Sequence, residues 1–214
     1  MAIRVLIADD HGVVAEGLRF VVEAQPDMAV IDCIQDSREA VRRSIEACPD
    51  VVLIDHAMPL LNGTEAAYLI RERCPETRVI ILSMYSNQVH VVRALQAGAT
   101  GYVVKKSAAK EVVDAIRTVH NGGRYLSKEL ADSVIDHIVH KTVSVDPLES
   151  LSSRERQVLQ MLAEGHTVAH IATTLALSSK TVETYRARMM EKLDIRDLAT
   201  LVKFAIQHGI TPLE

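Results

Sequence analysis

The chain has 214 residues, 48% of them hydrophobic, and a formal net charge of −4 at pH 7. This length allows one large or two small domains with real cores, and the composition is typical of globular proteins. No apolar run approaches the roughly 18 residues of a membrane span, and the acids Asp9 and Asp10 come too early for a secretory signal. We therefore expect a cytoplasmic protein without membrane contact.

The first 120 residues alternate short apolar runs with segments of helical periodicity. We predict strands at 3–8, 28–34, 51–54, 78–83 and 101–104, and helices at 12–24, 37–47, 63–73, 88–97 and 108–120. Pro26, Pro49 and Pro75 each follow a predicted helix closely, as expected of helix stops. The alternation predicts a five-stranded, parallel, doubly wound α/β domain.

The pattern changes after residue 122. A helix is predicted at 127–140, and "KTVSVDPLES" has the composition of a linker. From Leu151 the periodicity is helical only, with four helices that begin near Ser152, Val168, Ser179 and Asp197. We predict an α/β domain at 1–122, a helix-containing linker at 123–147 and a small all-α four-helix domain at 148–214.

Polar residues stand at the ends of four predicted strands: Asp9 and Asp10, Asp55, Ser83 and Lys105. The carboxyl ends of parallel strands meet at one edge of the sheet, where ligands bind. Each residue alone has an ordinary explanation as a helix cap, a turn serine or a solvated lysine. Together, three carboxylates and one lysine suit Mg²⁺ and a phosphate group, so we favour the joint functional interpretation.

The segments "LIADDH", "VVLIDHAMP", "ILSMYS" and "GATGYVVKKS" resemble the receiver domain of bacterial two-component response regulators. The resemblance implies a flavodoxin-like fold whose phosphoacceptor, Asp55, receives a phosphoryl group from a sensor histidine kinase. It further implies Mg²⁺ held by Asp9, Asp10, Asp55 and the backbone carbonyl of Ala57, a switch pair of Ser83 and Tyr102, and a charge-offsetting Lys105. Lys106 is also a lysine, but strand alternation and the resemblance favour Lys105.

The tail has helix-turn-helix spacing, which by itself also suits a plain helical bundle. More specifically, "LSSRERQVLQMLAEG" and "IATTLALSSKTVETYRARMMEKL" resemble the LuxR-type DNA-binding domain, which with a receiver defines the NarL/FixJ class. The resemblance implies a recognition helix from Ser179, a homodimer through the helix at 197–208, and double-stranded DNA as partner. The residues expected at the DNA are Lys180, Thr181, Glu183, Thr184, Arg186, Ala187, Arg188 and Lys192.

Two alternatives remain beside a DNA-binding regulator. In the first, the tail is a protein-interaction bundle attached to a receiver. In the second, the chain is a phosphatase of the haloacid-dehalogenase type, which needs a second acid two residues after its nucleophile. Ala57 follows Asp55 and His11 follows Asp9 at that spacing, so we expect a regulator and not an enzyme.

The three cysteines, Cys33, Cys48 and Cys74, lack metal-ligand spacing and cannot all pair. This suits a reducing compartment. We expect them to be packing residues or bystanders.

Overall fold

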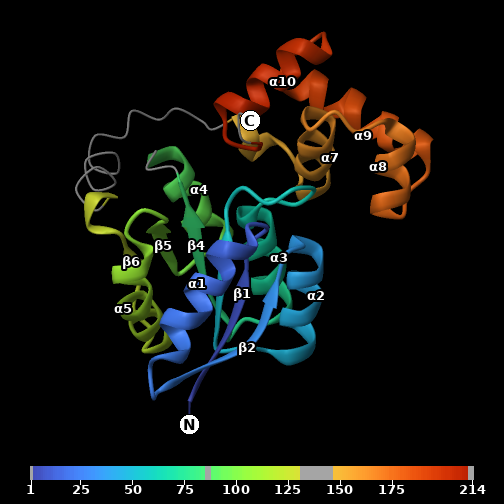
Figure 1. Cartoon of the computed structure of the whole chain (residues 1–214). Coiled ribbons are helices and arrows are strands. Elements are labelled where there is room, and N and C mark those ends of the chain that lie inside the picture. Colours follow the sequence, from blue (N-terminus) through green and yellow to red (C-terminus); the bar gives the residue numbers. More distant parts are fainter. Residues whose placement is uncertain (1, 85–87, 131–146, 212–214) are drawn as a thin grey trace. The chain divides into compact units, whose positions relative to one another are not determined.

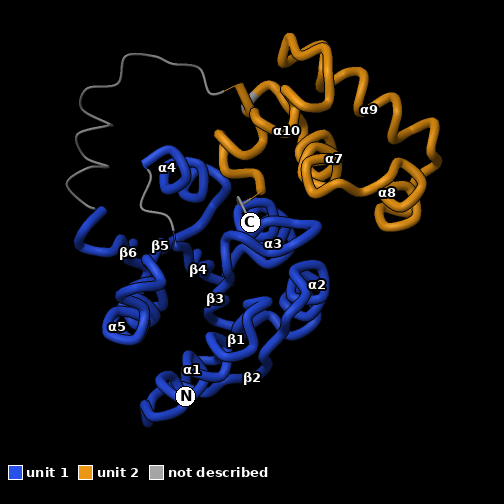
Figure 2. The backbone as a smooth tube through the Cα atoms, turned by 45° about the horizontal axis from the view of Figure 1, so that its top comes forward, with its two compact units in different colours: residues 1–140 blue, residues 141–214 orange. Residues whose placement is uncertain are grey.

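The computed structural model describes residues 2–84, 88–130 and 147–211 (Figure 1). The chain divides into two compact units, residues 1–140 and 141–214, which Figure 2 colours separately. Most of the helix predicted at 127–140 and most of the predicted linker lie outside the described residues; residues 128–130 of that helix are described and are helical. Within the described part of the chain, no helix has the length and apolar character needed to cross a bilayer.

The first unit contains a parallel sheet in the order β2-β1-β3-β4-β5-β6. Its strands are β1 (Ile3–Ala8), β2 (Met28–Ile34), β3 (Val51–Asp55), β4 (Arg78–Ser83), β5 (Gly101–Val104) and β6 (Tyr125–Leu126). The prediction of five strands was wrong by one, because β6 has only two residues and carries no periodicity that a sequence pattern could reveal. Strand order reverses between β1 and β3, which is where ligands bind in such sheets.

Helices cover both faces of the sheet (Figure 1). They are α1 (Gly12–Glu23), α2 (Ser37–Ala47), α3 (Gly63–Arg73), α4 (Gln88–Ala97) and α5 (Ala108–His120). Alternate side chains of β1 enter two separate cores: Val5 and Ile7 pack with α1 and α5, whereas Leu6 and Ala8 pack with α2, α3 and α4. Burial on both faces explains why the strands are continuously apolar, and the predicted doubly wound α/β class is confirmed.

The second unit contains a short 3₁₀ turn (Pro147–Ser150) and the helices α7 (Ser153–Ala163), α8 (Val168–Leu175), α9 (Ser179–Lys192) and α10 (Leu198–Gln207). The predicted capping box is present, with the side chains of Ser152 and Glu155 each accepting a backbone N–H of the other residue. Ala176 ends α8 with φ 54°, and Ser178 caps α9, so the chain turns sharply between these helices. The predicted all-α unit is therefore confirmed.

Candidate functional site

Three charged side chains from three strand ends meet at the carboxyl edge of the sheet. Lys105 follows β5, and its Nζ lies 2.8 Å from Asp9 Oδ2 and 3.0 Å from Asp55 Oδ2. Asp9 is fully buried and Asp55 is 2% exposed, so one ammonium group bridges two carboxylates that water scarcely reaches. The next residue, Lys106, is exposed. The structure thus brings together Asp9, Asp55 and Lys105 from the predicted set.

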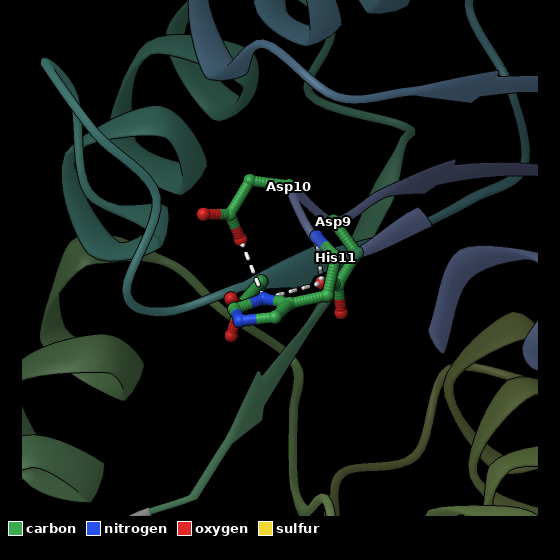
Figure 3. A group of neighbouring side chains, drawn as sticks. Asp9, Asp10 and His11 are labelled. Atoms are coloured by element: carbon green, nitrogen blue, oxygen red, sulfur yellow. Dashed lines mark hydrogen bonds and ion pairs between the residues drawn. The ribbon is translucent and has the colours of Figure 1, made fainter. Parts of the chain in front are cut away.

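Asp10 and His11 are the more exposed part of this cluster, and Figure 3 shows the His11 ring beside the Asp10 carboxylate. His11 Nδ1 lies 2.9 Å from Asp10 Oδ1, and the His11 backbone N–H donates to Asp9 Oδ1 at 2.9 Å. The residue at the N-cap of α1 is His11, whose side chain makes no capping bond. Neither acid therefore serves as the helix cap of α1. The sequence argument missed His11, whose place directly after an acidic pair was the available signal.

The acidic cluster has the donor set of a cation site. Asp9, Asp10, His11 and Asp55 each offer one ligand atom, and these atoms all lie within 4.8 Å of one another. Among the described residues, the buried Asp9 Oδ2 has no hydrogen-bond donor of normal geometry, although it has the ion pair with Lys105. Carboxylate oxygens that lie this close together fit a hard divalent cation such as Mg²⁺.

The environment of Asp55 disfavours its ionised form. Burial raises the pKa of the Asp55 carboxyl above its ordinary value; the Lys105 ammonium opposes this rise, and the charge of Asp9 adds to it. The backbone N–H of Ala57 donates a hydrogen bond to the same carboxyl and also favours its charged form. A further cation at this edge would therefore favour the carboxylate, the form that a nucleophile needs.

The loop after β3 folds back closely onto the strand end. The His56 carbonyl accepts a hydrogen bond from the Gly63 N–H at 3.0 Å. A β-carbon at Gly63 would lie 2.4 Å from the backbone oxygen of Asp55, so only glycine fits at this approach. Asn62 caps α3 by accepting from the Glu65 N–H, and it fixes the same turn. Gly63 supports the site and was not among the residues singled out from the sequence.

Ser83 and Tyr102 lie on the neighbouring strands β4 and β5. Ser83 is 1% exposed and Tyr102 is fully buried. Burial raises the pKa of the Tyr102 phenol to about 12, although a hydrogen bond with the Ser83 side chain opposes this rise. The ring lies in the core with α2, α3 and α4, so the described conformation holds this tyrosine inward and bonded to the serine.

Buried and exposed residues lie on opposite sides of the helix α9. Val182 and Met189 are fully buried. Of the residues predicted to contact DNA, those that are exposed are Lys180, Glu183, Thr184, Ala187, Arg188 and Lys192. The spacing of the first five places them along one side of the helix, opposite the core. Such a face could enter a DNA groove.

Several predicted DNA contacts already have partners inside this unit. The Thr181 N–H and hydroxyl bond to Ser178 in the cap of α9, and the Thr184 hydroxyl donates to the Lys180 carbonyl. Arg186 lies 3.7 Å from Glu183, at the outer limit of an ion pair. Thr181 and Arg186 are half-buried. Lys180 and Arg188 are therefore the predicted cationic contacts that are exposed on this side of α9.

Lys192 joins α9 to α7 through a buried acid. Its Nζ lies 2.7 Å from Oε2 of Glu155, and the same oxygen accepts from the Ser152 N–H at 2.8 Å. Burial favours the protonated acid, but the Lys192 ammonium and the Ser152 donors together outweigh it and lower the pKa of Glu155. The pair fixes the end of α9 on the core of the unit.

Replacing Glu155 with glutamine is expected to lower the free energy of unfolding of the second unit by about 1–3 kcal/mol at neutral pH, because the charge that pairs with Lys192 is lost, although the amide oxygen can still accept the Ser152 N–H. Since the folded-state pKa is lowered from 4.5, this contribution is present above that value and is lost as the pH falls through the folded-state pKa. Urea unfolding at neutral and acidic pH measures both effects. The exposed Glu191→Gln on α9 is the control, and equal stability of the two variants at neutral pH would contradict the expectation.

Comparisons with known families match both units. Residues 5–117 match the response regulator receiver domain. Residues 149–205 match the bacterial regulatory proteins of the luxR family. The two matches together span most of the chain and agree with the two resemblances drawn from the sequence.

Named relatives match over nearly the whole length. Oxygen regulatory protein NreC of Staphylococcus carnosus is 33% identical over 210 residues, covering 95% of this chain and 97% of the relative. Response regulator UvrY of Escherichia coli K12 is 35% identical over 212 residues, covering 99% of this chain and 97% of the relative.

Solved structures of RcsB show the same fold. RcsB from Salmonella enterica serovar Typhimurium, bound to a promoter in the presence of a phosphomimetic, aligns with TM-score 0.61 at 25% identity over 99% of this chain and 100% of that chain. A structure of two RcsB dimers bound to two parallel DNAs also aligns with TM-score 0.61 at 25% identity, over 95% of this chain and 98% of that chain.

Proposed function

The chain belongs to the NarL/FixJ class of two-component response regulators, and we propose that phosphorylation of Asp55 controls how its C-terminal domain binds DNA. The observation that carries the choice of Asp55 is the bridge that Lys105 makes between Asp9 and Asp55 at the carboxyl edge of the sheet. We assign the receiver to residues 1–122, the linker to 123–147 and the DNA-binding domain to 148–214, with the difference that β6 (Tyr125–Leu126), at the start of the predicted linker, pairs with β5 of the receiver sheet. The two matched family ranges fall within the first and last of these.

In the proposed transfer, a carboxylate oxygen of Asp55 attacks phosphorus in a phosphohistidine of the sensor kinase. The new oxygen–phosphorus bond forms as the phosphorus–nitrogen bond breaks, and the imidazole of the kinase leaves. Lys105 lies within ion-pair distance of Asp55 and offsets negative charge on the transferring group. The Ala57 N–H and the Gly63 turn hold the acceptor in place.

Asp9, Asp10 and Asp55 would hold the Mg²⁺ ion, together with the backbone carbonyl of Ala57. The ion would supply positive charge to the phosphoryl oxygens. His11, whose side chain is 66% exposed, lies 2.9 Å from the Asp10 carboxylate at the solvent side of this site.

Replacing Asp10 with asparagine is expected to weaken Mg²⁺ binding at least about tenfold, because a hard cation loses an anionic oxygen ligand. Isothermal titration calorimetry with MgCl₂ measures the affinity. The control is Asp114→Asn, an exposed acid on α5. Unchanged affinity in the Asp10 variant would remove Asp10 from the proposed metal ligands.

We propose that Ser83 and Tyr102 convert phosphorylation of Asp55 into a change in the surface of the receiver domain. A phosphoryl group adds about 1.5–2 negative charges and strong acceptor oxygens beside the end of β4. The Ser83 hydroxyl would then donate to phosphate, which competes with its bond to Tyr102. A bias of a few kcal/mol between two receiver conformations is enough for a useful switch.

The exposed face of α9 is proposed to enter the major groove of double-stranded DNA, with two copies of the chain binding as a homodimer in the cytoplasm.

Replacing Arg188 with alanine is expected to weaken DNA binding by about 5- to 100-fold and to reduce its dependence on salt, because one cationic contact is lost. Gel shifts with genomic fragments over a salt series measure both.

The exposed Arg154→Ala on α7 is the matched control, since it removes the same charge from a helix outside the proposed interface. If neither phosphorylation state of the wild type bound DNA, or if binding had no salt dependence, the interaction-bundle alternative for the tail would be preferred.

A further inference from the structure

Two cysteines that lie 26 positions apart in sequence meet in the first unit. Cys48 stands at the C-cap of α2 and Cys74 at the C-cap of α3, and their Sγ atoms are 3.2 Å apart. The sequence suggested only packing residues or bystanders, because the spacing of these cysteines fits no motif. Both sulfurs are free thiols, and Cys33 is a third, half-buried thiol on β2.

The backbone around the pair is well held. Arg4 donates through its two terminal nitrogens to the carbonyls of Cys48 and Ala47, at 3.1 Å and 2.9 Å. The Cys74 N–H donates to the Ile70 carbonyl, and Cys74 Sγ lies 3.5 Å from the Ser44 carbonyl. Cys48 has φ 41°, a left-handed conformation that favours glycine at a helix end. The Cys48 side chain is therefore present at this position despite a conformational cost, and its sulfur contacts Cys74 Sγ.

The two thiols differ in their access to solvent. Cys48 is exposed, whereas Cys74 is only 4% exposed. Burial raises the pKa of the Cys74 thiol to about 11, and the Cys48 sulfur adds to this rise. Cys48 is therefore the sulfur that a dissolved oxidant meets first, and Cys74 lies directly behind it.

We propose that Cys48 and Cys74 are a redox-active pair that a hydroperoxide converts into an intramolecular disulfide. The Cys48 thiolate attacks the peroxide, the O–O bond breaks, and the products are a sulfenic acid on Cys48 and an alcohol or water. The Cys74 sulfur then attacks the Cys48 sulfur, and the hydroxyl leaves as water with the Cys74 proton. Two thiols lose two electrons and the peroxide gains them.

The pair lies at the opposite edge of the sheet from Asp55. Cys48 precedes the start of β3 and Cys74 precedes the start of β4, whereas Asp55 ends β3. The disulfide would join the ends of α2 and α3 and close a loop that contains β3 and α3. Because it makes no contact with the phosphorylation site, the inference does not rest on the proposed function.

The test treats the full reduced chain with hydrogen peroxide at low molar excess, followed by alkylation and peptide mapping without reductant. The expected result is a link between the Cys48 and Cys74 peptides, with titratable thiols falling from three to one. Dithiothreitol should restore all of them. The oxidised chain should melt about 10 °C higher, because the cross-link restricts the unfolded state.

Matched variants separate this pairing from others. Cys33→Ser should still form the link, whereas Cys48→Ser and Cys74→Ala should not. Peptide mapping of the oxidised wild-type chain tests the proposal without any variant, so a variant that fails to fold does not affect the result. Retention of all three thiols, a link that involves Cys33, or cross-linking only between chains would overturn the proposal.

Discussion

Replacing Asp55 with asparagine is expected to abolish phosphorylation of the chain by acetyl phosphate in the presence of Mg²⁺. An amide cannot supply the anionic oxygen that attacks phosphorus, whereas the wild-type chain should gain one phosphoryl group. Intact-protein mass spectrometry under mildly acidic conditions measures the label. The Asp114→Asn chain, changed at an exposed acid of α5, should be labelled like the wild type.

The same variant separates lost chemistry from lost folding. Because burial raises the pKa of Asp55 in the folded state, this carboxyl contributes a loss of receiver stability in metal-free buffer as the pH rises from 3.8 through the folded-state value. Asparagine carries no charge and removes this pH dependence. The variant is therefore expected to be at least as stable as the wild type at neutral pH, as measured by urea unfolding. Equal labelling of the variant and the wild type would refute the assignment of Asp55.

Replacing Lys105 with methionine is expected to slow phosphorylation of Asp55 by about 100-fold or more. The substitution removes an ammonium group that contacts Asp9 and Asp55, and mutations of such charge-stabilising groups typically have effects of this size. It also leaves two buried carboxylates without their shared cation. In metal-free buffer, at a pH where both acids are ionised, this should reduce the free energy of unfolding of the receiver by about 3–5 kcal/mol.

Lys106→Met is a close control for this variant, because it changes the adjacent lysine, which is exposed. We expect it to be labelled at the wild-type rate. Time courses of labelling with acetyl phosphate compare the three chains directly. If Lys106→Met were slow and Lys105→Met normal, the roles of the two lysines would be exchanged.

Much of the first unit could be predicted from its sequence because its strands are buried on both faces. Each such strand is a short apolar run that ends on a polar residue, and parallel strands bring those ends to one edge. The contacts of Asp9, Asp55 and Lys105 follow from this rule. The rule could not predict β6, whose two residues carry no period, or the inward position of Tyr102, which depends on packing around the ring.

Contacts between neighbouring helices were harder to predict. The meeting of Cys48 with Cys74 depends on how the ends of α2 and α3 lie side by side, which helical periodicity does not specify. Lys192 was assigned to DNA from its place on the recognition helix, and its pairing with the buried Glu155 adds a structural role that the sequence did not reveal. The capping box of Ser152 and Glu155 could be recognised in the sequence. The contact of Lys192 with the same Glu155 side chain could not, because Lys192 lies on another helix.

The most direct measurement compares the DNA affinity of one preparation before and after treatment with acetyl phosphate and Mg²⁺, at fixed salt, on a fragment selected from genomic DNA. Phosphorylation should tighten binding of the wild-type chain by at least about tenfold and should leave the Asp55→Asn chain unchanged. Equal affinity of the phosphorylated and unphosphorylated wild type would contradict control of DNA binding by Asp55.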